Sequence, residues 1–263
     1  MKKASALILS IFASSAFCVD EYMPIEKGKF EVDLGFGYTG ITGSYDSSGK
    51  KSDDSGAITM VPIQLKYGII PGLDAEVVWN MQMNNKDAGD LSGFTQPEIA
   101  LKYAMPEIGA GLFVDGIMPF ALGDWGDTAK YPAPALGIQI GAVFGKTFDK
   151  FRATAVGSYR INLENSDSLK MGNLLDFYFK PEFLLNEFAG IYAGIKYDMA
   201  SKAEFGGTAI PNSEGFQLTI LPGWNATWLK WLSTEINVPY VVMGKNAPAS
   251  WGVTALFYAT FPM

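Results

Sequence analysis

The sequence predicts an all-β protein: a transmembrane antiparallel β-barrel of about twelve strands, with short periplasmic turns and long extracellular loops. Three observations predict this fold. Apolar and polar residues alternate with a period of two along most of the chain. The connections between the alternating segments are long and short in turn, and the apolar face of the segments carries no charged residue. A period of two places successive side chains on opposite faces of a strand, so each segment has one apolar and one polar face.

The clearest alternation is a hairpin at residues 57–84. In its second arm Leu73, Val77 and Trp79 share one face, and Asp74 and Glu76 share the other. Glycine and proline between the arms, at residues 68–72, are typical of a tight turn. Strands of about ten residues with a charged second face suit a transmembrane barrel. A water-soluble sandwich would bury the apolar face instead, and the rest of the chain decides between the two folds.

The remaining strands follow from the same alternation. In chain order the predicted strands are residues 30–39, 57–67, 73–84, 97–103, 112–120, 136–144, 151–162, 175–183, 191–198, 216–225, 232–242 and 251–261. The short connections are residues 68–72, 105–109, 147–150, 186–187 and 227–228. The long ones are residues 43–56, 85–94, 121–133, 164–173, 200–214 and 244–250. Strict sorting of loops by length is expected of an outer-membrane barrel, and a sandwich has no reason to show it.

Composition supports a strand-built membrane protein. Aromatic residues make up 14% of the chain and glycine occurs 29 times, while charged residues reach only 18% against the roughly 25% of soluble domains. Aromatic residues gather near the predicted strand ends, as the interfacial girdles of barrels require. Six prolines fall inside or beside the predicted strands and are expected to mark bulges or strand ends.

The N-terminus has the pattern of a secretory signal peptide at residues 1–18. Two lysines precede a short apolar run and a stretch of small residues, and cleavage is expected after Ala16 or Cys18. Cys18 could instead carry a lipid, although Phe17 is a poor match to the small residue expected before such a cysteine. We expect residues 19–263 to form a single barrel domain in the outer membrane. No later run of about 18 apolar residues predicts a transmembrane helix.

Several functions are excluded by composition. The formal net charge of −7 argues against a nucleic-acid partner, which would need a basic surface. The chain has no histidine, so histidine-based triads and metal sites are absent. Its single cysteine allows no disulfide within the chain. We therefore expect no enzymatic activity, no catalytic residue, no metal site and no cofactor.

The candidate site is the charged face of the strands, which a barrel turns toward its lumen. The residues predicted to line the lumen are Lys66, Glu76, Glu98, Lys102, Arg152, Arg160, Lys180, Glu182, Lys196 and Glu235. Mixed carboxylates and bases could set the selectivity of a pore. Equally, they could form a charge network that fills and braces the interior. A barrel of about twelve strands lies between filled small barrels and open porins, so its width leaves both readings open.

A second candidate site is the predicted external loop that contains Asp124, Trp125, Asp127 and Tyr131. In a non-conducting structural or adhesive barrel, this loop would contact a partner. The leading prediction is a passive channel for small solutes, with the adhesive barrel as the alternative. Asp124 and Asp127 could in principle bind a divalent cation, but solvated loop charge is the more common role of such residues.

The hairpin at residues 67–77, a tyrosine, a short turn and an acidic alternating strand, resembles outer-membrane barrels of the phenol meta-pathway transporter type. The overall plan of a signal peptide followed by about twelve strands agrees with that resemblance over the whole chain. The resemblance implies passage of small solutes, including hydrophobic or aromatic compounds. Many such barrels end in an aromatic residue that is read during assembly, whereas this chain ends in Met263, with Phe261 as the nearest outward aromatic. The expected partners are outer-membrane lipid, a small-molecule solute and the barrel-assembly machinery.

Overall fold

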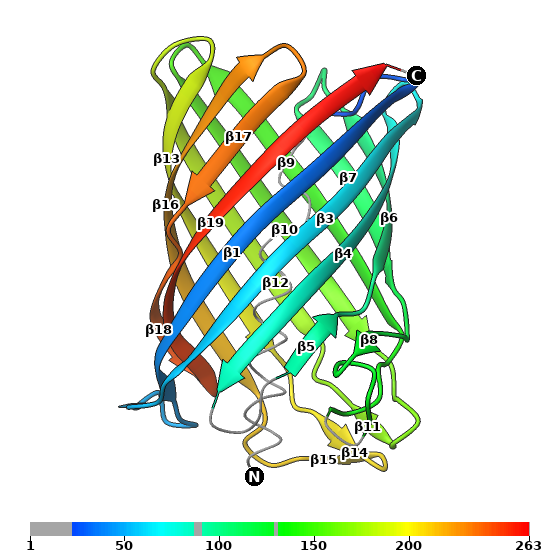
Figure 1. Cartoon of the computed structure of the whole chain (residues 1–263), viewed down its shortest axis with the longest axis vertical. Helices are drawn as coiled ribbons and strands as arrows, with labels where there is room; N and C mark the ends of the chain where they lie inside the picture. The colour runs from blue at the N-terminus through cyan, green and yellow to red at the C-terminus, as the bar shows by residue number, and fades with distance from the viewer. Residues whose placement is uncertain (1–22, 87–90, 129–130, 263) are drawn as a thin grey trace.

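The computed structural model describes residues 23–86, 91–128 and 131–262. The predicted signal peptide at residues 1–18, with both cleavage positions, lies outside these ranges. Within them the chain is built of β-strands, and no helix there is long and apolar enough to cross a bilayer. The strands form one closed antiparallel barrel of 12 strands, so the predicted fold class is confirmed (Figure 1).

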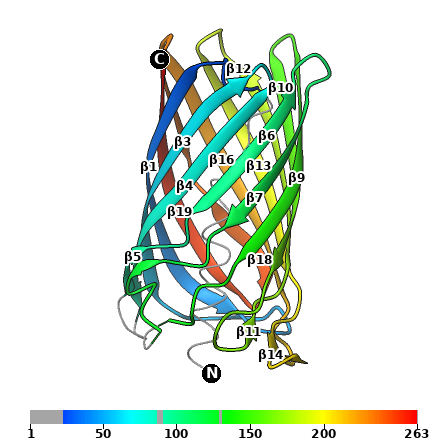
Figure 2. The same cartoon turned by 90° about the vertical axis from the view of Figure 1, so that its right-hand side faces the viewer.

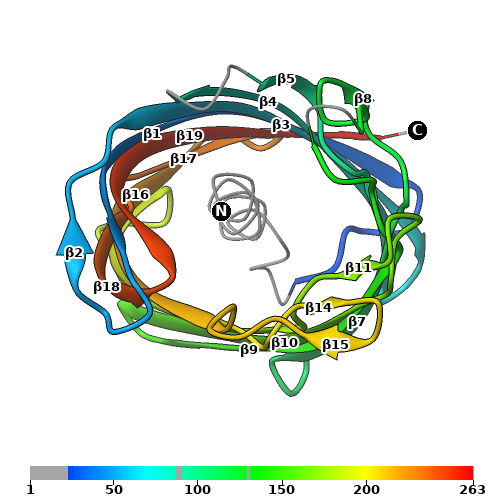
Figure 3. The same ribbon diagram turned by 90° about the horizontal axis from the view of Figure 1, so that it is seen from below.

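The wall follows the chain order. Its strands are β1 (Lys29–Tyr45), β3 (Gly56–Ile70), β4 (Leu73–Lys86), β6 (Glu98–Met105), β7 (Ala110–Ile117), β9 (Gly137–Phe148), β10 (Phe151–Asn162), β12 (Leu174–Leu184), β13 (Ala189–Ala200), β16 (Gly215–Leu229), the interrupted pair β17 (Leu232–Asn237) and β18 (Tyr240–Lys245), and β19 (Ala247–Pro262). Each strand pairs antiparallel with the next, and β19 pairs with β1 from one rim to the other, which closes the ring seen end-on in Figure 3.

The two rims differ as predicted. Tight turns lie at the rim where β1 begins and β19 ends, at the top of Figure 1. The opposite rim carries the long connections and most of the short strands, β2 (Lys51–Ser52), β5 (Leu91–Phe94), β8 (Leu122–Gly123), β11 (Leu169–Lys170), β14 (Glu204–Phe205) and β15 (Thr208–Ala209) (Figures 1 and 2). In barrels of this type the short turns are periplasmic, so we refer to the two rims as the periplasmic and the outer rim.

The barrel is apolar outside and polar inside. Along β6 the residues Glu98, Ala100 and Lys102 are buried, whereas Ile99 and Leu101 between them are exposed. The same inversion is found on the other wall strands. The exposed apolar residues include Leu34, Phe36, Val77, Leu112, Val114, Ile138, Ile140, Phe144, Phe177, Ile191, Ile195, Ile220, Val253 and Phe257. An exposed apolar belt around a polar interior is the arrangement that a lipid bilayer stabilises.

Some prolines lie at interruptions of the wall and others do not; Pro97 lies in the gap between β5 and β6, which both pair with β4. Pro62, Pro181 and Pro222 lie inside continuous strands, while Val238 and Pro239 separate β17 from β18. The amide of Val238 bonds to the carbonyl of Pro222, and the amide of Gly252 bonds to that of Pro239, each at 2.8–2.9 Å. The predicted strand at residues 232–242 is therefore broken, although its neighbours bridge the gap.

The prediction of a long loop at residues 244–250 is wrong. Asn246 alone separates β18 from β19, with a positive φ of 49°. The four residues from Ala247 to Ser250 are all buried, and Ala247 packs against Leu174 and Ala200. Because β19 here pairs with β1 while β18 pairs with β16, the apolar start of β19 belongs to the wall and not to a loop.

We expect Ile140→Arg to lower the free energy of unfolding by roughly 2 to 4 kcal/mol, because Ile140 faces outward near the middle of β9 and would place a cation in hydrocarbon. The measurement is urea unfolding in lipid vesicles. Phe148→Arg, on the same face at the end of β9, is the control and should cost about 0 to 1 kcal/mol. Equal losses at the two depths would contradict a bilayer-spanning orientation.

Candidate functional site

The inward face of the wall brings together charged residues from strands that are far apart in the sequence. All ten residues predicted to line the lumen lie on this face, and nine of them are buried. The tenth, Arg152, has a side chain that is 37% exposed. Carboxylates outnumber bases there, since six further acidic residues face inward. These are Glu31, Asp33, Asp74, Asp115, Asp176 and Asp198.

One group of ion pairs crosses β1, β3, β4 and β6 near the periplasmic rim. The ammonium of Lys66 lies 3.0 Å from Glu31 and 2.9 Å from Asp33. On the next strands, Lys102 lies 3.2 Å from Glu76 and 3.5 Å from Asp74. The register places Lys66 directly opposite both Glu31 and Glu76, so these are cross-strand pairs that hold their charged ends against the wall.

A second group lies on β10, β12 and β16. Arg152 donates from two nitrogens to one carboxylate oxygen of Glu182, at 2.7 and 2.8 Å. The other oxygen of Glu182 accepts a hydrogen bond from the side-chain amide of Asn225 at 2.8 Å. Because both oxygens of this fully buried carboxylate are engaged, the position of the Arg152 guanidinium is well defined.

Tyr192 organises the neighbouring pair. Its hydroxyl donates to Glu235 at 2.5 Å, and the ammonium of Lys180 lies 3.3 Å from the same carboxylate and 5.1 Å from the centre of the tyrosine ring. Tyr192 itself lies against Gly223 on β16, where a Cβ atom would stand less than 3.0 Å from the ring. Glycine at this position therefore allows the ring to lie flat on the wall.

The same arrangement recurs elsewhere on the inner wall. Phe113 lies over Gly141, and Tyr178 lies over Gly194. Phe113 also packs with Val143 and Tyr178 in an apolar cluster between the charged groups. The alternation of polar and apolar residues did not predict these contacts. Each residue follows the inward parity, but the pairing of a ring with a glycine depends on the register between neighbouring strands.

Residues 23–28 fold into the periplasmic mouth and meet the first charged group. The amide of Ile25, a buried residue, donates to both carboxylate oxygens of Asp74 at 3.1 Å. The amide of Gly28 bonds to the carbonyl of Gly68 at 2.8 Å. A Cβ at Gly68 would collide with the backbone of Ile25 and Glu26, so glycine is required for this close approach.

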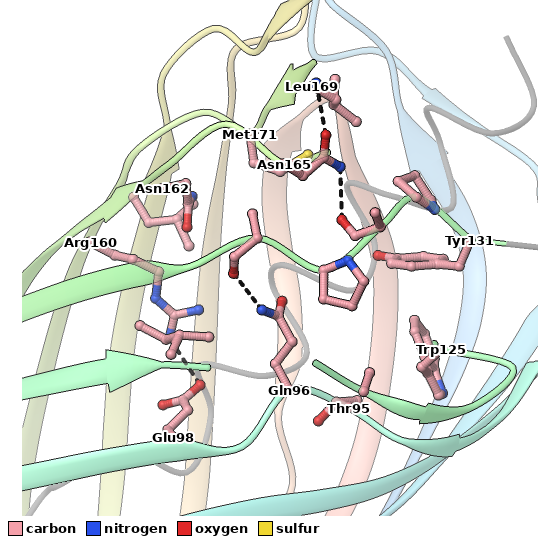
Figure 4. Close-up of a pocket in the computed structure, with 17 residues that line it drawn as sticks. Thr95, Gln96, Glu98, Trp125, Tyr131, Arg160, Asn162, Asn165, Leu169 and Met171 are labelled. Atoms are coloured by element: carbon pink, nitrogen blue, oxygen red, sulfur yellow. Dashed lines mark hydrogen bonds and ion pairs between the residues drawn. The ribbon is translucent and has the colours of Figure 1, made fainter. Parts of the chain in front are cut away.

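Beneath the outer rim lies a cavity of about 120 Å³ that we call the outer vestibule (Figure 4). Trp125 and Tyr131 form part of its wall, in an edge-to-face contact with ring centres 4.8 Å apart. The segment of residues 131–135 completes that side. Gln96 holds this segment by donating to the carbonyl of Ala135 at 2.6 Å, and Asn165 by donating to the carbonyl of Ala133 at 2.8 Å.

The opposite side of the outer vestibule is polar. Arg160 reaches it from β10, paired with Glu98 at 3.2 Å and bonded to the side-chain oxygen of Gln139 at 3.0 Å. Asn162 lies beside it (Figure 4). The vestibule thus offers aromatic and proline surface on one side and a neutralised guanidinium with amides on the other.

The four residues predicted for the external loop have different environments. Trp125 is 3% exposed and its indole donates to the backbone carbonyl of Gln82 at 3.2 Å, so the ring points inward. Asp124 accepts hydrogen bonds from the amide and hydroxyl of Ser92. Asp127 is exposed. The described part of the chain contains no group of three or more histidine, cysteine or acidic side chains that could hold a metal ion.

A second cavity, of about 270 Å³, lies at the periplasmic end and is lined by polar groups. Arg152, Lys180 and Glu235 contribute charges, and threonines from several strands contribute hydroxyls. The outer vestibule thus combines aromatic and amide surface with the Arg160–Glu98 pair, whereas the cavity near the periplasmic rim is lined mainly by charged and hydroxyl groups, with Trp231 and Tyr258 beside them.

No protein-family model matches the sequence, and no curated protein matches it significantly. Solved structures do match the fold. An outer-membrane channel from Pseudomonas putida F1 aligns over 93% of this chain and 100% of its own, with a TM-score of 0.79 and 14% identity. The translocator domain of the autotransporter NalP from Neisseria meningitidis covers 99% of this chain and 98% of its own, with a TM-score of 0.62 and 10% identity. The predicted resemblance to outer-membrane barrels is thereby confirmed at the level of the fold.

We expect Gly223→Ala to lower the free energy of unfolding by roughly 1 to 3 kcal/mol, because the new methyl would push the Tyr192 ring off the wall and strain its bond to Glu235. Urea unfolding in detergent measures the loss. Gly157→Ala is the matched control: Gly157 is exposed on β10, and no atom lies within 4 Å of its added Cβ. In a Tyr192→Ala background the effect should disappear, and its persistence there would contradict this explanation.

Proposed function

We propose that this chain is a passive outer-membrane channel for small solutes. The observation that carries the proposal is the inversion of the barrel: an apolar belt outside, and inside a wall of charged and polar residues with a cavity toward each rim. The ion pairs hold the charged ends on the wall as cross-strand pairs. The fold shared with the Pseudomonas putida outer-membrane channel agrees with this function.

The outer vestibule supports a class of solute. Trp125 and Tyr131 offer aromatic surface, while Gln96 and Asn162 bring polar side chains to the same cavity. Small pockets that combine apolar walls with a few polar groups bind molecules of matching, mixed character. We therefore propose small solutes with a hydrophobic or aromatic part and at least one polar group.

An adhesive barrel has weaker support. That alternative relies on Trp125 as a contact for an external partner, but the ring is buried and its indole nitrogen donates to the carbonyl of Gln82 on β4. Tyr131 packs against the same ring. Both rings face the outer vestibule, so they offer little surface to a partner outside the barrel.

We propose that the chain reaches the membrane by export, with residues 1–18 removed, and that residues 19–263 are inserted as one domain by the barrel-assembly machinery. The last strand supports this proposal, because Phe257 and Phe261 are exposed along β19. Phe261 lies 6.1 Å from the ring of Trp231, within the aromatic girdle at the periplasmic rim.

The deciding experiment is single-channel recording of the refolded protein in a planar bilayer, with a salt gradient to read selectivity. Discrete conductance steps are expected. Continued silence from a protein whose folding is shown by a heat-dependent shift on a detergent gel would overturn the proposal.

The lumen charges give a sharper expectation. Arg152→Glu should move the reversal potential toward the equilibrium potential of the cation, because it adds negative charge to a lumen in which carboxylates already outnumber bases. The double exchange Arg152→Glu with Glu182→Arg keeps the ion pair and the net charge, and should restore the wild-type potential. If the single and double variants share one potential, the site does not act on passing ions through its charge.

Trp125→Ala tests the proposed solute class. We expect a small aromatic alcohol, benzyl alcohol, to reduce the ion current by occupying the outer vestibule, and the alanine variant to need a several-fold higher concentration for the same reduction. Trp228→Ala is the control, because this tryptophan is 59% exposed and packs on Trp224 instead. Equal sensitivity of both variants and the wild type would remove the vestibule from the proposal.

A further inference from the structure

Asp115 differs from the other inward carboxylates of the lumen. It lies on β7 between Ala100 of β6 and Gln139 of β9, and only 1% of its surface is exposed. Neither of its carboxylate oxygens accepts a hydrogen bond from a described residue. Buried polar atoms in proteins almost always have a partner, so an exception calls for a physical explanation.

The two cross-strand neighbours of Asp115 do not supply one. Ala100 offers only a methyl group. The side-chain oxygen of Gln139 accepts from Arg160 at 3.0 Å, and its nitrogen donates to the hydroxyl of Ser158 at 3.1 Å. Arg160 in turn pairs with Glu98 at 3.2 Å. These contacts of Gln139 and Arg160 go to groups other than Asp115.

Two more carboxylates face the same small space. Glu98 lies diagonally across from Asp115 on β6, and Glu76 lies on β4, opposite the far side of Ala100. Glu76 is engaged by Lys102 at 3.2 Å and by the amide of Gln64 at 3.1 Å. Lys102 and Arg160 balance the charges of Glu76 and Glu98, so the three carboxylates and two bases around Ala100 leave one formal negative charge, that of Asp115. A net negative charge at this position attracts a cation.

We propose that Asp115 is a station for a small monovalent cation, K⁺ or Na⁺, that passes through the lumen. Carboxylate and water oxygens are the ligands that such hard cations prefer. A buried carboxylate that accepts no hydrogen bond from the described residues holds the ion briefly with part of its hydration shell, which suits conduction because a site in a pore must also release its ion. The inference rests on the proposed channel function and narrows it to a lumen that favours cations over anions.

The test is Asp115→Asn. In a KCl gradient we expect the wild type to favour K⁺ over Cl⁻. The permeability ratio of K⁺ to Cl⁻ should be several-fold lower in the variant. Asp53→Asn removes the same charge from an exposed position in the outer loop and should leave the reversal potential unchanged. Unchanged selectivity in Asp115→Asn would overturn the proposal.

Stability provides a second readout that does not need conduction. If the station binds K⁺, the thermal midpoint of the refolded wild type should rise when KCl replaces N-methylglucamine chloride at equal ionic strength, because the ion binds only the folded state. Asp115→Asn should melt above the wild type without K⁺, since it removes an unpartnered buried charge, and it should not respond to K⁺.

The two readouts separate the possible failures. A wild type that is silent in bilayers but stabilised by K⁺ through Asp115 would contradict the channel and keep the station. A variant that melts lower than the wild type in both salts would show that Asp115 has a structural partner, and this would overturn the station. A conducting wild type with no K⁺ response would do the same.

Discussion

The structure depends on one constraint: in a bilayer every backbone amide and carbonyl must find its partner within the protein. The pairing of β19 with β1, which runs from Lys29 and Pro262 at one rim to Tyr45 and Ala247 at the other, removes the two strand edges that would otherwise face lipid. Where Pro239 interrupts the ladder, the amides of Val238 and Gly252 bond to proline carbonyls across the gap. Closure therefore tolerates a local break but not an open edge.

Closure also decides the environment of each side chain. Once the wall is a ring, one face of every strand contacts lipid and the other faces the lumen. The polar side chains are therefore confined to the lumen. The lumen resolves this crowding by pairing. Lys66 and Lys102 each meet two carboxylates, and rings such as Tyr192 lie flat over glycine. In a buried ion pair each charge needs its partner, because removing one partner leaves a buried charge unbalanced.

The two ends of the lumen differ in chemistry, and this bears on transport. Near the outer rim, Trp125 and Tyr131 provide aromatic surface beside amides, while near the periplasmic rim the cavity is lined by charges and hydroxyls. In the proposed channel, a solute that enters from the outer rim would meet the aromatic surface first and the charged surface afterwards.

The sequence by itself determined which face of its strand each side chain occupies. The period of two is a local property, so each of the ten predicted lumen residues could be assigned to the inner face from its neighbours alone. Which residues become partners was decided only by the tertiary structure. Arg160 and Glu98 are 62 positions apart, and strand register determines that they meet, while Asp115 accepts no hydrogen bond from the described part of the chain. Two further features lay outside local pattern. Trp125 turns inward because distant segments pack around it, and residues 247–250 join the wall because β1 offers them a ladder. Register and loop packing are contacts between remote residues, and a period of two carries no information about them.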